Sequence, residues 1–233
     1  GEDSRFLPVY SFETGEWHEA APGVNGFTVQ IVNVVFVESQ EGGGAWALVD
    51  AGMPGSAEKI VSAAEDRYGG GCRPSSILLT HGHFDHVGAI VELIRHWDVP
   101  VYAHESEMPY LTGQRPYPDA DPTVEGGLVA KMSPLFPVRP IQLGNRVSAL
   151  PRDGIVPGLP EWRWVHTPGH TPGHVSFFRD RDRALIAGDA FVTVKQHSLY
   201  RVLTQEVEIS GPPRYLTPDW QAARHSVNRL ARL

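Results

Sequence analysis

The segment LLTHGHFDHVG, residues 78–88, limits what this chain can fold into more than any other part of its sequence. Directly behind an apolar run, six positions hold three histidines and one aspartate: His81, His83, Asp85 and His86. Side chains of alternate residues in an extended segment point to the same side, so His81 and His83 can coordinate one ion. Asp85 and His86 follow at the expected start of a helix and can face a second ion. Imidazole and carboxylate ligands suit zinc, and also iron or manganese.

Strand-like and helix-like segments alternate along the chain. The strand-like segments are rich in β-branched and aromatic residues, and the helix-like segments repeat apolar residues at spacings of three and four. We expect strands within 27–39, 45–52, 75–80, 99–107, 162–167, 174–180 and 184–190, and helices within 55–71, 87–97 and 217–233. Ser56 and Thr217 are the expected N-terminal caps of the first and last helices. Strands followed by helices, twice over, favour an α/β sandwich over a helical bundle.

Size and charge narrow the class of protein further. With 233 residues, 41% of them hydrophobic, the chain can bury a sizeable core, and we expect a single domain over residues 1–233. The net charge of −7 and the lack of a basic run disfavour a nucleic-acid partner. Cys72 is the only cysteine, which excludes both an internal disulfide and a cysteine-rich zinc knuckle.

The expected partner is a small-molecule substrate. No apolar stretch approaches the ~20 residues that span a bilayer, so we expect no membrane segment. The N-terminus also lacks the charged and apolar regions of a signal peptide, which predicts a cytoplasmic location. Association into a homo-oligomer is compatible with the sequence.

Three further motifs accompany the histidine cluster in a fixed order. LVDAG contains Asp50 and precedes the cluster, VHTPGHTPGH contains His170 and His174, and AGDA contains Asp189. Together with THGHFDHVG, these motifs resemble those of the metallo-β-lactamase superfamily, from about residue 27 to Asp189. The resemblance implies a four-layer αββα sandwich, made of two mixed β-sheets with helices outside.

The same resemblance implies a role for each motif residue. His81, His83 and His170 would hold one metal ion, and Asp85 and His86 a second. Asp189 would bridge the two ions. Asp50 would support the histidine loop without touching a metal. Because the family uses the first histidine of TPGHTPGH as its ligand, we interpret His174 as a supporting residue too.

One ligand of this pattern has no counterpart. Family members supply a last histidine to the second metal from a GH motif shortly after a helix like the one expected at 217–233. The sequence stops before any such motif, so we expect a C-terminal part to be missing and the second site to be incomplete. The alternative is a natural one-metal variant. His225 lies within the helix and is not assigned as a ligand.

The predicted activity is metal-dependent hydrolysis. Two cations, zinc by preference with iron or manganese as alternatives, would generate a bridging hydroxide that attacks an ester-like bond of a lactone, a thioester or a similar substrate. Asp85 would orient the hydroxide and pass a proton to the leaving group.

Other activities compete with this one. A sulfur dioxygenase with one iron would suit the missing histidine, and a non-catalytic binding protein is a further alternative. A β-lactamase is disfavoured, because Asp189 stands where the cysteine-bearing enzymes place a thiolate. A lactonase would lack its usual tyrosine after Asp189, since the first tyrosine there is Tyr200.

Two loops are expected to shape the substrate pocket, because they flank the metal motifs. They cover residues 114–137, with a short helix near Val129–Met132, and residues 191–213. Aromatic residues in or beside these loops could line an apolar pocket or simply pack: Tyr110, Tyr117, Phe136, Tyr200 and Tyr215.

Overall fold

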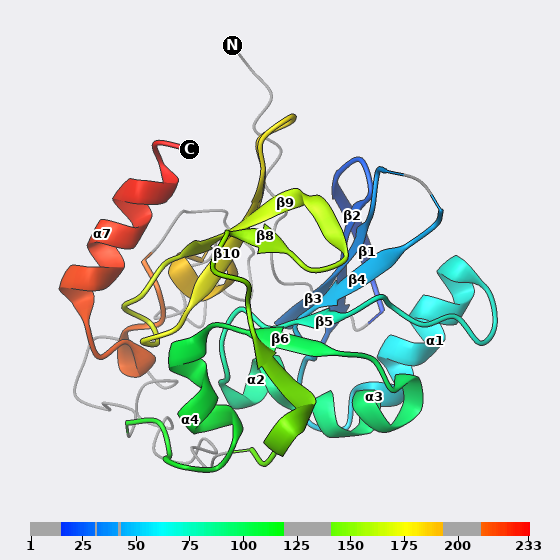
Figure 1. Ribbon diagram of the computed structural model, residues 1–233, viewed down its shortest axis with the longest axis horizontal. Coiled ribbons are helices and arrows are strands. Elements are labelled where there is room, and N and C mark those ends of the chain that lie inside the picture. The colour runs from blue at the N-terminus through cyan, green and yellow to red at the C-terminus, as the bar shows by residue number, and fades with distance from the viewer. Residues whose placement is uncertain (1–14, 31, 42, 119–140, 193–210) are drawn as a thin grey trace.

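The computed structural model describes residues 15–30, 32–41, 43–118, 141–192 and 211–233. Two β-sheets face each other, and helices lie on their outer sides (Figure 1). The layers run helix, sheet, sheet, helix, which confirms the predicted four-layer αββα sandwich. The short helix expected near Val129–Met132 and most of the two expected pocket loops lie outside the described residues.

The first sheet has seven strands in the order β1-β2-β3-β4-β5-β6-β7. The strands are β1 Trp17–Ala21, β2 Val24–Val29, β3 Val32–Glu38, β4 Trp46–Val49, β5 Ile77–Leu78, β6 Val101–Ala103 and β7 Val147–Ala149. Strands β1 to β4 pair antiparallel, and β4 to β7 pair parallel. The β-branched run at 27–39 thus forms most of the β2–β3 hairpin, with Phe27 opposite Val34.

The second sheet has four strands in the order β11-β10-β9-β8. They are β8 Ile155–Val156, β9 Leu159–His166, β10 Val175–Arg179 and β11 Ala184–Ile186. All pairings among these described strands are antiparallel, so the expectation of two mixed sheets holds for the first sheet only. The reason is that the strands follow one another through short turns, with no crossover helix between them.

Helices cover the two outer faces of the sandwich. The α-helices are α1 Ala57–Tyr68, α2 Phe84–Val87, α3 Ile90–Trp97, α4 Met108–Leu111 and α7 Trp220–Leu230. Short 3-10 turns are η1 Glu105–Glu107, η3 Gly144–Arg146, η4 Gly188–Ala190 and η5 Arg214–Leu216. Helices α1 and α3 pack on the first sheet, and α7 lies beside the second (Figure 1). Among the described residues, no helix is both long and apolar enough to cross a membrane.

Both predicted caps behave differently from expectation. Ser56 does precede α1, but its hydroxyl donates to the Met53 carbonyl and caps no backbone N–H. At α7 the cap is Asp219, whose Oδ1 accepts from the Ala222 N–H at 2.9 Å. The prediction of Thr217 as the cap was wrong, because its hydroxyl is engaged with the His170 ring.

Three apolar clusters hold the layers together. The largest joins α1 and α3 to the outer face of the first sheet, with Phe36, Ile60 and Leu93 fully buried. A second cluster fills the space between the sheets, where Val49 of β4 and Trp162 of β9 belong to the same group of buried residues. A smaller cluster joins Leu230 of α7 to the second sheet. The two sheets are thereby fixed against each other, and so are the loops at their ends.

Candidate metal centre

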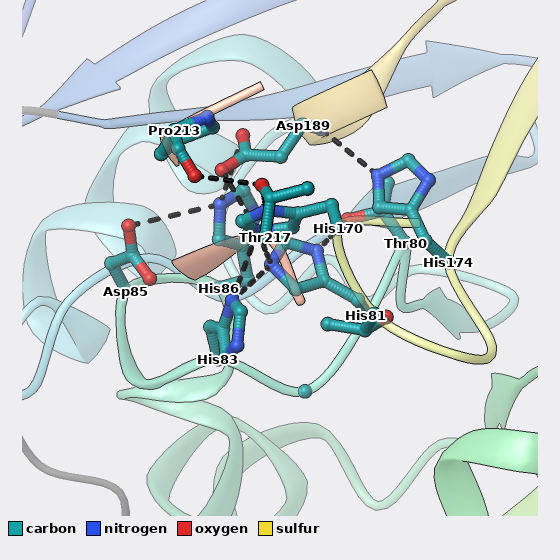
Figure 2. Close-up of polar contacts among 12 residues, drawn as sticks. Thr80, His81, His83, Asp85, His86, His170, His174, Asp189, Pro213 and Thr217 are labelled. Carbon is teal, nitrogen blue, oxygen red and sulfur yellow. Dashed lines mark hydrogen bonds and ion pairs between the residues drawn. The ribbon is translucent and has the colours of Figure 1, made fainter. Parts of the chain in front are cut away.

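The motif residues lie on segments that leave the ends of four strands. Asp50 follows β4, and the histidine cluster follows β5 and runs into α2. His170 lies in the loop between β9 and β10, and Asp189 lies in η4, directly after β11. Figure 2 shows the side chains of the histidine cluster, His170 and Asp189 pointing toward one another from separate segments. Such strand ends are where ligands bind in layered α/β proteins.

Three histidine nitrogens form the first cluster. His83 Nδ1 lies 3.0 Å from His81 Nε2 and 3.0 Å from His170 Nε2, and the last two atoms are 3.2 Å apart. Zinc bonded to imidazole nitrogen at about 2.0–2.1 Å in a tetrahedron separates its ligands by about 3.3–3.4 Å. All three rings are buried. The triangle therefore has nearly the size of one face of a tetrahedral zinc site.

A second cluster adjoins the first through Asp189. Its Oδ2 lies 3.3 Å from His170 Nε2, and its Oδ1 lies 3.5 Å from His86 Nε2. Asp85 Oδ2 is 3.8 Å from the same His86 nitrogen. The two sets His81, His83, His170 and His81, His86, Asp189 each have ligand atoms within 4.8 Å of one another. One carboxylate thus presents one oxygen to each cluster, as a bridging ligand would.

Asp85 gives a separate indication that a cation belongs at the second cluster. Its Oδ1 is buried and has no hydrogen-bond partner among the described residues. Burying a carboxylate oxygen without a partner is unfavourable unless a hydrogen-bond donor or a cation compensates for the lost water. A divalent ion at the second cluster, or a water bound to such an ion, would satisfy this oxygen, so the residues present fit a second ion.

Asp50 fixes the protonation of two of these rings. Its carboxylate accepts from the Thr80 N–H, from the Thr80 hydroxyl and from His86 Nδ1, each at 2.8 Å. Since the Thr80 hydroxyl donates to Asp50, it accepts from His81 Nδ1 at 3.0 Å. In the neutral form, each ring therefore carries its proton on Nδ1 and keeps a lone pair on Nε2 for a metal.

The Thr217 hydroxyl fixes the position of the proton on the His170 ring, a role that the sequence did not reveal. The Thr217 hydroxyl donates to the Pro213 carbonyl at 2.7 Å, so it accepts from His170 Nδ1 at 3.2 Å (Figure 2). The lone pair on His170 Nε2 then faces the cluster. No local spacing could signal this contact, because 47 positions separate the two residues.

His174 supports Asp189 and has no ring nitrogen left for a metal. Its Nε2 accepts from the Asp189 N–H at 2.9 Å, so its proton lies on Nδ1, 2.8 Å from the Thr167 hydroxyl. His225 lies on the exposed face of α7. The structure thus brings together the six residues assigned as ligands, with Asp50 and His174 behind them.

Burial sets the charge of the cluster. It lowers the pKa of His170 to about 4 and that of His174 to about 3, so both rings are neutral. Burial also lowers the pKa of His86, but the carboxylates of Asp50, Asp85 and Asp189 outweigh it and raise that pKa. The carboxylates therefore favour a positive charge at His86 while the imidazoles of the first cluster stay neutral, and a divalent cation bound there would take the place of the His86 proton.

Comparisons with known proteins agree with this geometry. The family model of the metallo-beta-lactamase superfamily matches residues 27–233. The chain is 53% identical over 228 residues to the probable metallo-hydrolase YflN of Bacillus subtilis (strain 168), covering 98% of this chain and 86% of the relative. It is 29% identical over 143 residues to the hydroxyacylglutathione hydrolase GloC of Haemophilus influenzae, covering 61% of this chain and 59% of that protein. A crystal structure of TTHA1623 in a di-iron-bound form matches with a TM-score of 0.57 and 28% identity, covering 86% of this chain and 81% of the other.

Proposed function

The chain belongs to the metallo-β-lactamase superfamily, and on that premise we propose that it hydrolyses an ester-like bond in a small molecule, with thioesters as the first substrate class and lactones as the second. Membership of this superfamily and similarity to a probable metallo-hydrolase identify the chain as a metallo-hydrolase. The observation that carries the proposal is the pair of adjoining ligand clusters, with one Asp189 oxygen near each of them.

We propose two divalent ions, with zinc the first candidate and iron or manganese the alternatives. His81, His83 and His170 would hold the first ion, Asp85 and His86 would hold the second, and Asp189 would contact both. When bound, such ions lower the pKa of a water from ~15.7 to near 7 and polarise a substrate carbonyl. The fit of the nitrogen triangle to tetrahedral coordination supports zinc at the first position.

Asp85 is the residue we propose for proton transfer. Its unpaired Oδ1 can accept a hydrogen bond from the attacking water and so orient it toward the substrate. The same oxygen can then carry a proton to the leaving group. His174 and Asp50 keep Asp189 and His86 in place without meeting the substrate.

The thioester assignment draws on relatives rather than on contacts. Proteins similar to this chain include hydroxyacylglutathione hydrolases, whose name denotes cleavage of an acyl–sulfur bond. The one-iron dioxygenase alternative requires no second metal, whereas Asp85 and His86 provide a second set of ligand atoms here. For that reason hydrolysis with two ions is the function we favour.

Metal removal is the first test of this function. Treatment with EDTA is expected to lower thioester or lactone hydrolysis at least about a hundredfold, and added zinc is expected to restore it, because the ions supply the ionised water. The measurement combines elemental analysis of the protein with a panel of thioesters, lactones, β-lactams and phosphodiesters. Hydrolysis that persists after full demetallation would refute the proposal. One iron per chain together with oxygen uptake on a persulfide would establish the dioxygenase instead.

The variant Thr217→Val tests the support of His170. Valine keeps the shape of threonine but cannot accept from His170 Nδ1, so the ring can rotate or change tautomer. Zinc affinity, measured by competition with a chelating dye, is expected to fall about tenfold or more. Thr217→Ser should retain wild-type affinity, as should the control Thr112→Val, whose hydroxyl also donates to a backbone carbonyl but away from the metal cluster. Equal affinities of Thr217→Val and wild type would contradict the role.

A further inference from the structure

Glu107 is a buried charged side chain that the proposed reaction does not use. It ends the η1 turn, and its exposed fraction is 0%. A carboxylate removed from water is strongly destabilising unless hydrogen bonds replace its hydration. Its position therefore requires an explanation.

Four hydrogen-bond donors surround this carboxylate. Its Oε2 accepts from the Gly82 N–H at 3.1 Å and from the Tyr117 hydroxyl, and its Oε1 accepts from the Thr171 hydroxyl at 2.7 Å and the Gly173 N–H at 2.8 Å. The backbone N–H groups of Gly82 and Gly173 can only donate. Such an arrangement suits an ionised carboxylate with both oxygens satisfied.

Three of the four donors, Gly82, Thr171 and Gly173, belong to the loops that carry the histidines. Gly82 lies between His81 and His83, and Thr171 directly follows His170. Gly82 is 25 positions from Glu107 along the chain, and Thr171 is 64 positions away. One side chain therefore joins the two loops that carry the nitrogen triangle.

The backbone on both sides is built for this close approach. A Cβ at Gly173 would lie 2.8 Å from Glu107 N and 2.7 Å from its Cγ, and one at Gly82 would lie 2.6 Å from the Tyr117 hydroxyl. A side chain at Gly173 would thus displace the backbone of the η1 turn. The two glycines let the loops reach the carboxylate with their own N–H groups.

The η1 turn is itself held in place. His104 Nδ1 caps it by accepting from the Ser106 N–H at 3.2 Å. The His104 ring stacks on His166, with ring centroids 4.1 Å apart, and His166 Nε2 donates to the Pro172 carbonyl at 2.9 Å. The base of the turn is therefore also tied to the loop that carries His170.

The nitrogen triangle needs such a restraint before any metal arrives. His81 Nε2 and His170 Nε2 both carry lone pairs and face each other at 3.2 Å, so they repel. Without an external tie, the two loops would relax apart and would have to be brought together again on binding. A preorganised site binds its ion more tightly, because its loops lose less conformational freedom on binding.

We propose that Glu107 is the positioning residue that fixes the two histidine loops against each other and so sets the affinity of the first metal site; this rests on the proposed metal centre. Glu107 does not contact the ion. It acts through the backbone of Gly82 and Gly173 and through the hydroxyl of Thr171.

The test is the variant Glu107→Gln, which keeps the side-chain shape but turns one oxygen into an NH₂ group that faces two donors. Zinc affinity by chelator competition is expected to fall about 10- to 100-fold. Cobalt-substituted protein should show an altered d–d absorption spectrum, because the ligand nitrogens of His81, His83 and His170 would no longer keep their relative positions. In the metal-free protein, the amide protons of Gly82 and Gly173 should exchange with solvent faster than in wild type.

A matched control is Glu38→Gln. Glu38 accepts from Arg67 Nε at 3.0 Å and from the Tyr68 hydroxyl at 3.2 Å, on the side of the first sheet that α1 covers. This change should leave zinc affinity within about twofold of wild type. If Glu107→Gln does not fold, Tyr117→Phe removes one donor to the same carboxylate, and its affinity should fall between those of wild type and a tenfold loss.

The outcomes separate this inference from the proposed function. A folded Glu107→Gln variant with wild-type zinc affinity, cobalt spectrum and amide exchange would overturn the role of Glu107. An equal loss of zinc affinity in Glu38→Gln would do the same, because the effect would then reflect stability alone. Wild-type protein that binds no zinc would instead refute the metal centre, and the exchange rates of the metal-free protein would still decide whether Glu107 joins the loops.

Discussion

The variant Asp189→Ala is expected to lower the kcat of the zinc-loaded enzyme by about a thousandfold or more. The Asp189 carboxylate lies 3.5 Å from His86 Nε2 and 3.3 Å from His170 Nε2, so it faces both clusters at once. Alanine removes both oxygens, and with them the ligand proposed to hold two ions side by side. The backbone N–H of residue 189 would still donate to His174, so the local fold should survive.

The measurement is steady-state kinetics on the best substrate of the hydrolysis panel, together with the metal content of each variant. The control is Asp180→Ala, which removes a carboxylate that pairs with Arg163 at the surface, 2.8 Å away. Its kcat should stay within about twofold of wild type, since surface ion pairs contribute little. A kcat of Asp189→Ala within about tenfold of wild type would contradict a bridging role, because the proposed reaction depends on both ions.

The candidate ligands could be predicted because their signal is local or carried by short motifs. The alternation of His81 and His83, and the neighbours Asp85 and His86, follow from a strand that ends and a helix that begins. His170 and Asp189 came only from the likeness of their motifs to the superfamily. The layered fold followed from strands and helices that alternate along the chain.

The supporting roles of Asp50 and His174 came from the resemblance, whereas those of Thr217 and Glu107 could not be predicted, because their contacts join residues far apart in sequence and lie outside the motifs. Thr217 reads as a helix cap in isolation, yet its hydroxyl serves His170 and leaves the cap to Asp219. Glu107 reads as one acidic residue in the run HESE, and only the packed structure shows that two loops converge on it. Local propensity describes the backbone of a segment, whereas the partner of a side chain depends on tertiary packing.

Helix α7 belongs to this support, although it carries none of the assigned ligands. Ser226 donates to the Pro168 carbonyl at 2.7 Å, and the Asp219 N–H donates to the Gly169 carbonyl at 3.3 Å. Gly169 has φ 134°, and a Cβ there would lie 2.2 Å from Ala223 N. Helix α7 therefore packs against the outer side of the His170 loop, while the Glu107 carboxylate accepts hydrogen bonds from the residues that follow His170. Together they leave that loop little freedom to move when a metal binds.

The variant Trp162→Ala is expected to lower the free energy of unfolding by about 4 kcal/mol or more. Trp162 is 1% exposed and belongs to the cluster between the two sheets, so alanine would leave a large cavity. Its ring also faces Arg179, whose Cζ lies 4.9 Å from the ring centroid. Arg179 is fully buried, and its Nη1 has no hydrogen-bond partner among the described residues, so the ring face replaces part of the lost hydration.

Urea denaturation followed by circular dichroism would measure this loss, with the slope of the transition as a check on two-state behaviour. Trp162→Phe keeps a ring beneath the guanidinium and should lose clearly less stability than Trp162→Ala. Trp220→Ala removes the same side chain from a position that is 41% exposed, and should change the free energy by no more than about 1 kcal/mol. A loss below about 1.5 kcal/mol for Trp162→Ala would show that the sheets can close over the cavity. A loss of about 4 kcal/mol or more would show that the packing between the sheets, from whose strand ends the ligand loops leave, supplies a large share of the stability of the fold.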